Sequence, residues 1–352
     1  MLTSGMKAIG MLAAAALALA APAASAAPRQ GSLDTYTSKG VSGYQFVVSC
    51  LSAKLCVLGG YNGKGVGDIV PVRNGTPQAA VTFKGTSAVY GVSCPNPSGC
   101  VALARTSNDV GAVFAAIGKS GKVTKSAKVS LPPLVSLQHL SCTRLTSCEV
   151  VGLDDTGFAR YAIEVGSWNG KKLTLHKTKV YKGDVTVTDI ACIGTSCDVA
   201  GYILGSNSKD TGFDLTVSHG SIGKLHTAAD DALYGISCVS ASRCYADGFS
   251  TGPSGEGLVV TANNGTIGSP HSVSGDLAGI ACAGSSCTAV GSAGSTEGEI
   301  GGVSSGVPGT PDVFPGIGPV NGVAVIGGMF FAIGSSGPGS HLPSELTYGN
   351  AF

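Results

Sequence analysis

Residues 48–60 read Val-Ser-Cys-Leu-Ser-Ala-Lys-Leu-Cys-Val-Leu-Gly-Gly, and this phrase decides the fold because the chain repeats it. An apolar residue and a small residue precede Cys50, and five residues separate it from Cys56. A short apolar run then ends in Gly60. Since the same phrase returns along the chain, the internal repeat is the first feature to interpret.

The cysteines fall into six close pairs, each separated by four or five residues. The pairs are Cys50 with Cys56, Cys94 with Cys100, Cys142 with Cys148, Cys192 with Cys197, Cys238 with Cys244, and Cys282 with Cys287. Their first members lie 44, 48, 50, 46 and 44 residues apart. A seventh copy carries Val325 and Phe330 in place of the two cysteines. Seven copies with a period of about 46 residues are typical of a propeller or a solenoid.

Six copies carry a turn glycine 24 to 28 residues after the first cysteine. These are Gly75, Gly121, Gly170, Gly220, Gly265 and Gly306. Most follow Asn, Ser or His, and such pairs supply the positive φ of tight hairpin turns. In the seventh copy the equivalent residue is Gly349, and the chain stops at Phe352, so one strand is missing there. Gly31 precedes Cys50 by the spacing seen between other copies, so a strand at about residues 32–42 is predicted to complete the last repeat.

This circular arrangement predicts an all-β fold, a seven-bladed β-propeller with four-stranded blades and a ring closed by the N-terminal strand. Alternation along the first strand of each repeat places the apolar residue and the cysteine on one face and the small residue on the other. Small residues suit strands that crowd together near an axis. An immunoglobulin-like array needs about 100 residues per domain, and a parallel β-helix has shorter coils, so both fit less well.

The two cysteines of each pair are expected to face each other across a hairpin neck, where Cβ atoms lie within disulfide reach. The sequence therefore predicts one hairpin disulfide in each of six blades. Zinc is the competing interpretation, but the spacing differs from that of zinc knuckles, and no metal or other cofactor is predicted. Each disulfide closes a loop of about seven residues and contributes about 2 kcal/mol to stability by restricting the unfolded chain.

Residues 1–26 have the order of a secretory signal peptide. Lys7 is followed by an Ala/Leu-rich stretch that ends at Ala24-Ser25-Ala26, a small-residue cleavage site. Residues 27–352 then form the propeller. The competing interpretation is an Ala-rich membrane anchor, although no other stretch of about 20 apolar residues follows. Export predicts a secreted protein and places the cysteines in an oxidising compartment.

Charge and composition exclude several classes of protein. The chain has 22 Lys+Arg and 21 Asp+Glu, so it lacks the basic surplus of an electrostatic nucleic-acid binder, and no nucleic acid is expected as a partner. Its 43% hydrophobic residues are enough for a core, which argues against disorder. Its 54 glycines weaken helices and fit tight turns and short strands.

The phrase apolar–Ser–Cys–x4/5–Cys–x–apolar–x–Gly, with an Asn-Gly turn as at residues 168–170, resembles a repeat common in secreted actinobacterial proteins. The resemblance covers the whole mature chain. Within that group the chain is most similar to the lectin-like propeller subunits of streptomycete umbrella toxin particles. The resemblance implies a propeller that caps a secreted assembly and selects target cells, while a separate large subunit carries the toxin. The partners it implies are other secreted subunits and a cell-surface glycan or polymer.

The chain departs from other propeller families in two ways. It has neither the Trp-Asp signature nor the Ser-x-Asp-x-Gly-x-Thr-Trp box of the sialidase type. With one Trp it also lacks the aromatic platforms common in sugar-binding sites, which argues against a generic lectin.

No catalytic constellation stands out. The six histidines fall at different positions of different repeats, and no Gly-x-Ser-x-Gly elbow, His-Glu-x-x-His pair or phosphate loop is present. No catalytic residue is therefore predicted. Asp247 is unusual because the other copies carry Gly or an apolar residue at this strand position. A buried carboxylate needs hydrogen-bonding partners, so Asp247 is expected to belong to a structural network or to a site in the channel.

The polar linker after the second strand differs in every copy. These linkers are expected on one face of the disc, and loops on a rigid scaffold commonly carry binding. The candidate binding residues are Tyr61, Asn62, Asp68, Arg105, Asn108, Asp154, Asp155, Arg160, Lys209, Asp210 and Glu256. The alternative is plain variation between loops.

Two functions remain open. The first is a secreted, non-catalytic binding propeller, a lectin-like recognition or adaptor subunit of an extracellular toxin particle that binds the target-cell surface. The second is a propeller-type lyase or hydrolase with a site at the central channel. The second function predicts a cluster of His, Arg and carboxylate at one mouth of the channel, and an axial lining of Ser, Ala and Gly alone would exclude it.

Overall fold

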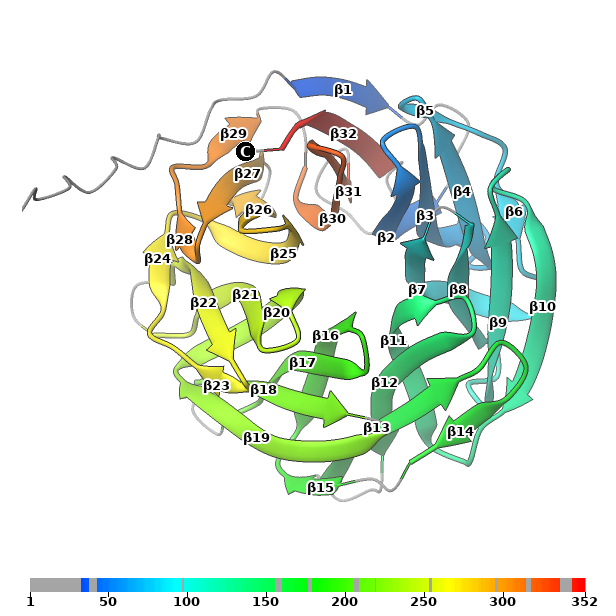
Figure 1. Ribbon diagram of the computed structural model, residues 1–352, viewed down its shortest axis with the longest axis horizontal. Helices are drawn as coiled ribbons and strands as arrows, with labels where there is room; N and C mark the ends of the chain where they lie inside the picture. Colours follow the sequence, from blue (N-terminus) through cyan, green and yellow to red (C-terminus); the bar gives the residue numbers. More distant parts are fainter. Residues whose placement is uncertain are drawn as a thin grey trace, which may run out of the picture.

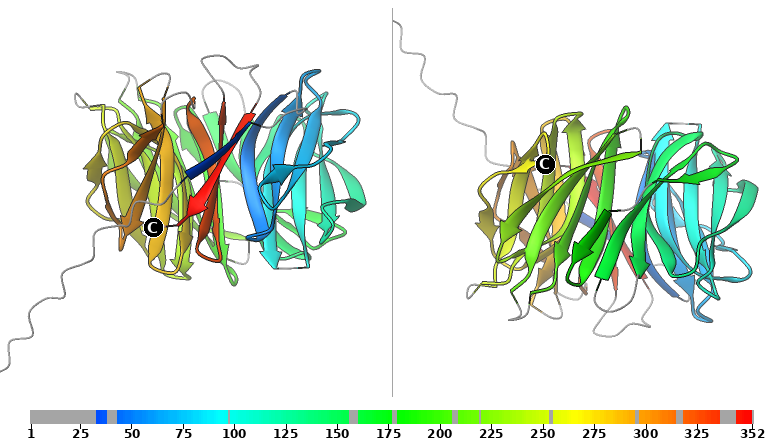
Figure 2. Two further views of the ribbon diagram at one scale, coloured as in Figure 1. Left: turned by 90° about the horizontal axis from the view of Figure 1, so that it is seen from above. Right: turned by 90° about the horizontal axis from the view of Figure 1, so that it is seen from below.

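The computed structural model describes strands and turns that are arranged in a circle about a common axis (Figure 1) and form a thick disc when seen edge-on (Figure 2). The described residues are 33–37, 43–96, 98–155, 160–176, 179–205, 209–218, 220–252, 255–294, 297–314, 318–335 and 344–351. The predicted signal peptide, residues 1–26, lies outside them. Within these ranges no helix is found that is long and apolar enough to cross a membrane.

The strands follow the sequence repeats, which are numbered here from one (Cys50) to seven (Val325). Repeat one forms β2 (Gly43–Ser52), β3 (Leu55–Asn62), β4 (Gly67–Arg73), β5 (Thr76–Pro77) and β6 (Val81–Thr82). Repeat two forms β7 (Thr86–Asn96), β8 (Gly99–Thr106), β9 (Gly111–Gly118) and β10 (Val123–Ser130). Repeat three forms β11 (Val135–Arg144), β12 (Ser147–Asp155), β13 (Arg160–Trp168), β14 (Leu173–Leu175) and β15 (Lys179–Lys182).

The remaining repeats have the same order. Repeat four forms β16 (Val185–Ile193), β17 (Ser196–Ile203), β18 (Thr211–Ser218) and β19 (Ser221–Ala229). Repeat five forms β20 (Asp231–Ser240), β21 (Arg243–Ser250), β22 (Gly257–Asn263), β23 (Thr266–Ile267) and β24 (His271–Val273). Repeat six forms β25 (Asp276–Ala283), β26 (Ser286–Ala293), β27 (Glu297–Ser304), β28 (Val307–Pro308) and β29 (Asp312–Phe314). Repeat seven forms β30 (Val320–Ile326), β31 (Met329–Ser335) and β32 (Ser344–Asn350).

Neighbouring strands within each repeat pair antiparallel, from an innermost first strand to an outer edge. Repeats four and five share one nine-stranded sheet because a single parallel bridge, between Thr211 and Asp231, joins β18 to β20. The innermost strands of successive repeats contact each other, and β30 of repeat seven contacts β2 of repeat one. The first described strand, β1 (Leu33–Thr37), pairs antiparallel with β32. Gly349, expected at a turn, instead lies inside β32 opposite Leu33.

All six predicted disulfides are present, and each joins the first and second strands of its repeat with Cα atoms 3.8–4.0 Å apart. The bonds join Cys50 to Cys56, Cys94 to Cys100, Cys142 to Cys148, Cys192 to Cys197, Cys238 to Cys244, and Cys282 to Cys287. The predicted pairing is therefore confirmed for every cysteine. No cysteine is free, so the zinc interpretation of the pairs is wrong.

The six turn glycines of the first six repeats are also as predicted, since all have φ between 70° and 86°. Asn74, Asn264 and Ser305 precede three of them with positive φ as well. Two successive residues with positive φ are the geometry of a type I′ hairpin turn, whose twist matches that of the strands it joins.

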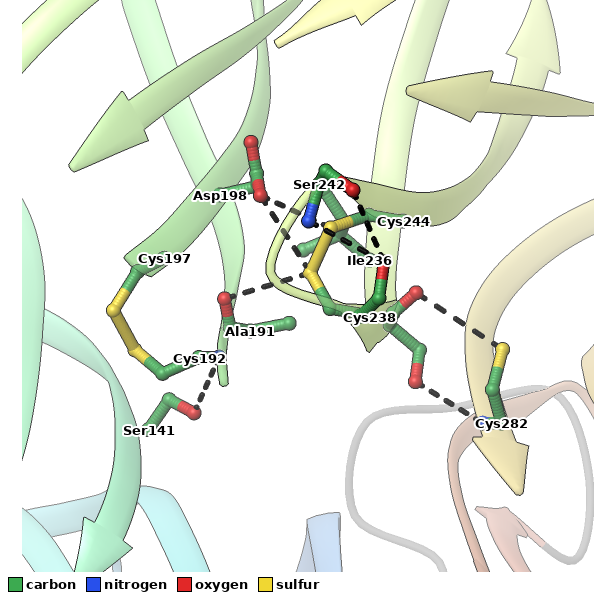
Figure 3. The surroundings of a disulfide bond; sticks show 12 residues. Ser141, Ala191, Cys192, Cys197, Asp198, Ile236, Cys238, Ser242, Cys244 and Cys282 are labelled. Carbon is green, nitrogen blue, oxygen red and sulfur yellow. Dashed lines mark hydrogen bonds between the residues drawn. A yellow bond between two sulfur atoms is a disulfide. The ribbon is translucent and has the colours of Figure 1, made fainter. Parts of the chain in front are cut away.

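The small residue before each first cysteine lies where two repeats meet. The Ser49 hydroxyl accepts a hydrogen bond from the amide of Cys94 at 3.1 Å, and Ser93 accepts one from Cys142 at 2.9 Å. Ser141 accepts the same bond from Cys192 at 3.0 Å (Figure 3). A serine therefore fits between crowded inner strands and also bonds one repeat to the next.

The hydrophobic core is divided among the junctions between repeats. Each cluster of buried apolar side chains draws on two successive repeats, and one joins Phe331 and Ile333 of repeat seven to Leu58 and Val70 of repeat one. The single Trp belongs to this core. Trp168 is buried and stacks on Phe114, with ring centroids 4.2 Å apart, so it has a structural role.

Candidate functional site

A β-bulge recurs in the innermost strand of every repeat, at the residue four positions before the first cysteine or its equivalent. Pairing with the second strand shifts register there, so the bulged residue is left out of the ladder. The bulged residues are Phe46, Tyr90, Gln138, Thr188, Tyr234, Ala278 and Asn321. All of them line one axial cavity of about 560 Å³. The bulge therefore directs one side chain per repeat toward the axis.

One side of the cavity carries a cluster of aromatic rings from repeats one and two. Phe46 lies between Tyr44, Tyr61 and Tyr90, with ring centroids 5.9, 6.4 and 5.6 Å away. The amide of Asn321 donates a hydrogen bond to the Tyr44 hydroxyl. This cluster, Tyr44, Phe46, Tyr61 and Tyr90, is called the first aromatic cluster below.

A cation lies over the first aromatic cluster. The Arg105 guanidinium is 4.9 Å from the centroid of the Tyr90 ring, which is within the range of a cation–π contact. Its Nε atom also pairs with Asp109 at 2.9 Å, and Nη1 donates to the Ser136 hydroxyl at 3.4 Å. These three contacts hold the planar group at the rim of the cavity.

A second aromatic cluster comes from repeats four and five. Tyr234 meets Tyr202 edge-on at 5.8 Å and stacks on Phe249 at 6.0 Å. Burial, followed by Tyr202 and the carboxylates of Asp210 and Asp276, raises the pKa of Tyr234 to about 12. Its hydroxyl is therefore a neutral hydrogen-bond donor and acceptor at physiological pH.

Two titratable side chains lie between the aromatic clusters. His139 follows the bulge of repeat three, and burial lowers its pKa to about 4 although a bond to the backbone of Val187 opposes that effect. Asp189 follows the bulge of repeat four. Its two carboxylate oxygens accept the amides of Ile190 at 2.8 Å and Ile236 at 3.1 Å, and burial raises its pKa to about 6. The cavity is thus lined by a neutral imidazole and by a carboxyl group that is already engaged.

Asp247 lies behind this lining and is fully buried. Burial, and then the nearby Asp189 carboxylate, raises the pKa of Asp247 to about 8, against the opposing effect of the amides of Gly279 and Gly235. A Cβ atom on Gly235 would lie 2.4 Å from the Asp247 carboxylate. The carboxyl group therefore fills the space that Gly235 leaves between repeats five and six.

A second pair of acids lies at the junction of repeats four and five. Asp198 Oδ2 lies 3.0 Å from Sγ of Cys244 and 3.7 Å from Sγ of Cys238 (Figure 3). Burial raises the pKa of Asp198 to about 6, and burial together with Asp198 raises that of Asp214 to about 8. Among the described residues Asp198, Cys238 and Cys244 form the one group with metal-ligand spacing. Because both sulfurs are in a disulfide, neither offers the thiolate that a metal would need.

The predicted linker residues are dispersed. Of the eleven candidates, Arg105 alone is among the residues that line the cavity, and Tyr61 belongs to the first aromatic cluster behind it. Asp68 is buried in β4, where it accepts a hydrogen bond from the Gln45 amide at 2.9 Å. Asn62 closes a turn by accepting the amide of Lys64 at 2.9 Å.

The other candidates lie farther out. Lys209 pairs with Asp230 at 3.1 Å, and Asn108 and Glu256 are exposed. Asp210 lies close enough to affect Tyr234, and Asp154 close enough to help raise the pKa of Glu164 to about 7, after the larger effect of burial. Asp155 and Arg160 are positioned at strand ends, and their side chains lie outside what the structure describes.

Sequence reasoning missed the residues that line the cavity. Phe46, Tyr90 and Tyr234 stand at one repeat position, which the position-by-position comparison of copies could have singled out. The count of Trp residues did not reveal them, because the rings are Phe and Tyr from different repeats. The expectation that the chain lacks aromatic platforms is therefore wrong.

Comparison with known proteins places the fold. No protein-family model matches the chain, and no curated protein does. The WD40 β-propeller domain of Doa1 matches with TM-score 0.57 and 10% identity over 90% of this chain and 96% of that domain. The PQQ-bound aldose sugar dehydrogenase from Streptomyces coelicolor matches with TM-score 0.54 and 12% identity over 92% of this chain and 99% of the enzyme. At these identities the likeness shows the fold alone, and the predicted all-β propeller fold is confirmed.

Proposed function

We propose that each of the seven repeats is one blade and that the ring is closed, with the N-terminal strand as the outer strand of the last blade. The contact between β30 and β2 supports closure, as does the pairing of β1 with β32. The cluster that joins Phe331 and Ile333 to Leu58 and Val70 adds apolar packing at the same junction.

The protein so formed is a secreted, non-catalytic binding propeller, a lectin-like recognition or adaptor subunit of an extracellular toxin particle that binds the surface of a target cell. One observation carries the binding role: a 560 Å³ cavity with aromatic rings and a few fixed polar groups, the usual composition of a small-ligand site. Six disulfides fit an extracellular location.

The cavity suits a saccharide unit of a surface glycan. Sugar rings have apolar faces that pack on Tyr and Phe, and hydroxyl groups at their edges need hydrogen-bond partners. Tyr90 and Tyr234 offer rings from two sides, while Gln138, Thr188 and Asn321 offer amide and hydroxyl groups between them. Because these side chains project from bulges in a disulfide-braced scaffold, little ordering entropy opposes binding.

Titration calorimetry of the mature protein with glycans isolated from target-cell walls tests this site. Tyr90→Ala and Tyr234→Ala are each expected to weaken binding by about tenfold or more, the usual effect of truncating an aromatic anchor. Tyr161→Ala removes a ring from β13, the third strand of repeat three, which does not contribute this ring to the cavity lining, and serves as the matched control. Absence of glycan binding by the unaltered protein, or equal affinity of all three variants, would refute the site.

The adaptor role has its own test. A tagged copy is recovered from the culture supernatant of the producing organism without denaturation, and co-purifying proteins are identified. Stoichiometric recovery with a much larger secreted chain is expected. Recovery of a lone monomer would exclude a role in a larger particle and would leave a free-standing lectin as the remaining binding role.

A lyase or hydrolase at the channel is the second candidate, because Arg105, His139 and Asp189 line the cavity and the lining is not restricted to Ser, Ala and Gly. The geometry favours it less. The Asp189 oxygens already accept two amides, and the His139 ring bonds to the backbone of repeat four. Mass analysis of glycans after incubation distinguishes the two candidates. Cleavage that disappears in His139→Ala and Asp189→Asn would establish an enzyme, whereas unchanged glycan would count against it and leave binding to be judged by calorimetry.

A further inference from the structure

The cations and acids of this nearly neutral chain are unevenly divided between the two faces of the disc. Antiparallel order places the first-to-second and third-to-fourth strand turns of each repeat on one face, called the hairpin face here. The amide of Asn74 donates to the carbonyl of Lys54 at 2.9 Å, and that of Asn264 to Ser242 at 2.8 Å, so the two turns of a repeat lie side by side. The second-to-third loops and the connections between repeats lie on the opposite, loop face.

The hairpin face is basic and is concentrated over the first three repeats. The exposed cations there are Lys54, Arg73, Lys119, Lys122, Arg144, Lys171 and Lys172, and they are called the basic arc. Repeat five adds Arg243. The turn segments of this face, such as residues 51–55, 73–76, 118–123, 143–147 and 168–173, contain no Asp or Glu. No neighbouring acid therefore neutralises the basic arc within these turns.

The loop face differs because it carries many acids in addition to cations such as Lys64 and Lys84. Its acids include Asp154, Asp184, Asp210, Asp230, Glu256 and Asp276. Two of its cations, Arg105 and Lys209, are paired with Asp109 and Asp230. The aromatic cavity belongs to this side, because Arg105 and Tyr61 lie at the ends of β8 and β3 that lead into the second-to-third loops.

The basic arc also lacks the apolar groups of a packed protein interface. The exposed large hydrophobic side chains of the described chain are Val110, Leu134, Val180, Leu204, Val307 and Val313. None belongs to the turns of the first three repeats on the hairpin face. Protein–protein interfaces are enriched in aromatic residues and depleted in Lys, whereas binding of a linear polyanion needs mainly fixed cations.

We propose that the basic arc binds a linear anionic polymer whose repeating units carry phosphate or carboxylate groups. The cations stand on turns that are braced by hydrogen bonds and, in each of the three repeats, by a disulfide one strand away. The backbone of these turns is held in place, so contacts with the polymer release counterions and order only the side chains of the cations. The site is separate from the cavity and lies on the other face of the disc.

Titration of the mature protein with inorganic polyphosphate, with alginate and with neutral dextran tests the proposal. Binding to polyphosphate or alginate, and not to dextran, is expected, and the tighter of the two identifies the anion. Affinity should fall by about fiftyfold or more between 50 and 200 mM salt if about four charges are engaged. The variant Lys119→Gln/Lys122→Gln/Lys171→Gln/Lys172→Gln should lose most of this affinity and have a smaller salt dependence.

Two double variants with the same loss of charge distinguish an effect of the basic arc from an effect of net charge. Lys171→Gln/Lys172→Gln should weaken polymer binding, whereas Lys64→Gln/Lys84→Gln, with the same loss of charge on the loop face, should not. Tyr90→Ala and Tyr234→Ala should leave polymer binding intact, which distinguishes this site from the cavity. Equal loss in both doubles, salt-independent binding, or loss in the Tyr variants would overturn the proposal. Failure of both polymers to bind would also overturn it and would direct attention to an acidic protein partner.

Discussion

The junction between repeats one and two differs from the junction between repeats four and five at two equivalent positions. Val57 and Ile69, both fully buried, occupy them in the first junction, and Asp198 and Asp214 occupy them in the second. The same backbone arrangement therefore packs apolar side chains at one junction and carboxyl groups at the other. The apolar junction is expected to be insensitive to pH, whereas the acidic junction is expected to lose stability as its carboxyl groups lose their protons.

Transferring a carboxylate into the apolar junction is expected to have the largest effect. Val57→Asp places an acid beside buried apolar side chains such as Val89 and Val92, which offer no hydrogen-bond donor. The free energy of unfolding should fall by about 3 kcal/mol or more, measured by denaturant unfolding at pH 7. Val57→Thr, of nearly equal volume, is the control. A loss no larger than that of the control would show that either junction tolerates an acid.

Replacing disulfides should have the next largest effect and should differ between junctions. Losing the bond from Cys94 to Cys100 through the double Cys→Ser variant should cost about 2 kcal/mol by the chain-entropy argument. At Cys238 and Cys244 the new hydroxyl groups can donate to Asp198, so the cost should be smaller by about 1 kcal/mol. Thermal unfolding without reductant measures both. The double Cys→Ala variants provide no donor, and their costs should be alike; a persistent difference would contradict the role of Asp198.

The acidic junction should contribute to the pH dependence of stability, in the same direction as Asp189 and Asp247, whose pKa values are also raised by burial. The folded-state pKa values, about 6 for Asp198 and about 8 for Asp214, lie above those of an unfolded chain, so the folded protein holds more protons. Stability is then complete at about pH 4 and is lost as the pH rises through 6 and 8. His139, with its pKa lowered to about 4, acts in the opposite direction because stability falls as it protonates. The Tm should therefore be highest in mild acid.

Neutral variants isolate the contribution of the two acids. Asp198→Asn and Asp214→Asn should raise the Tm at pH 8 by about 2–4 °C for each kcal/mol recovered and flatten its dependence on pH. Glu256→Gln, at an exposed acid, should leave the profile unchanged. An unaltered slope in both Asn variants would show that the junction is not the source.

The smallest effect should come from the hydroxyl that bonds neighbouring repeats. Ser49 accepts the amide of Cys94, whereas repeat four has Ala191 at the same position. Ser49→Ala should cost about 1 kcal/mol, and Ala191→Ser should recover a similar amount if its hydroxyl reaches the amide of Cys238. Denaturant midpoints of the two variants measure this exchange. A gain in stability for Ser49→Ala would contradict it.

The sequence predicted features that depend on near neighbours along the chain. The disulfides and the turn glycines follow from spacing within one repeat, and all of them are present. The cavity follows from residues of different repeats, such as Tyr90 and Tyr234, which meet only after the ring has formed. The linker positions were a poor guide for the same reason, since Asp68 turns inward while Tyr90, on an inner strand, lines the axis.

The distribution of charge over the molecule was likewise not predicted from the sequence. Equal numbers of acidic and basic residues suggested a chain without a basic stripe, yet the turns of β2, β4 and β9 carry cations and the opposite loops carry acids. A charge count over the whole chain adds the charges of both faces together and hides the difference between them. Sorting the same residues by the end of the strand at which they stand reveals the separation.

The pairing of β1 with β32 places Leu33 opposite Gly349, so it joins segments that lie far apart along the chain. Such contacts carry a large loop-closure penalty and are expected to form late in folding. Until they form, β32 has an unpaired edge, and an unpaired edge can pair with a strand of another molecule. Protection of this edge from aggregation therefore depends on the five residues of β1.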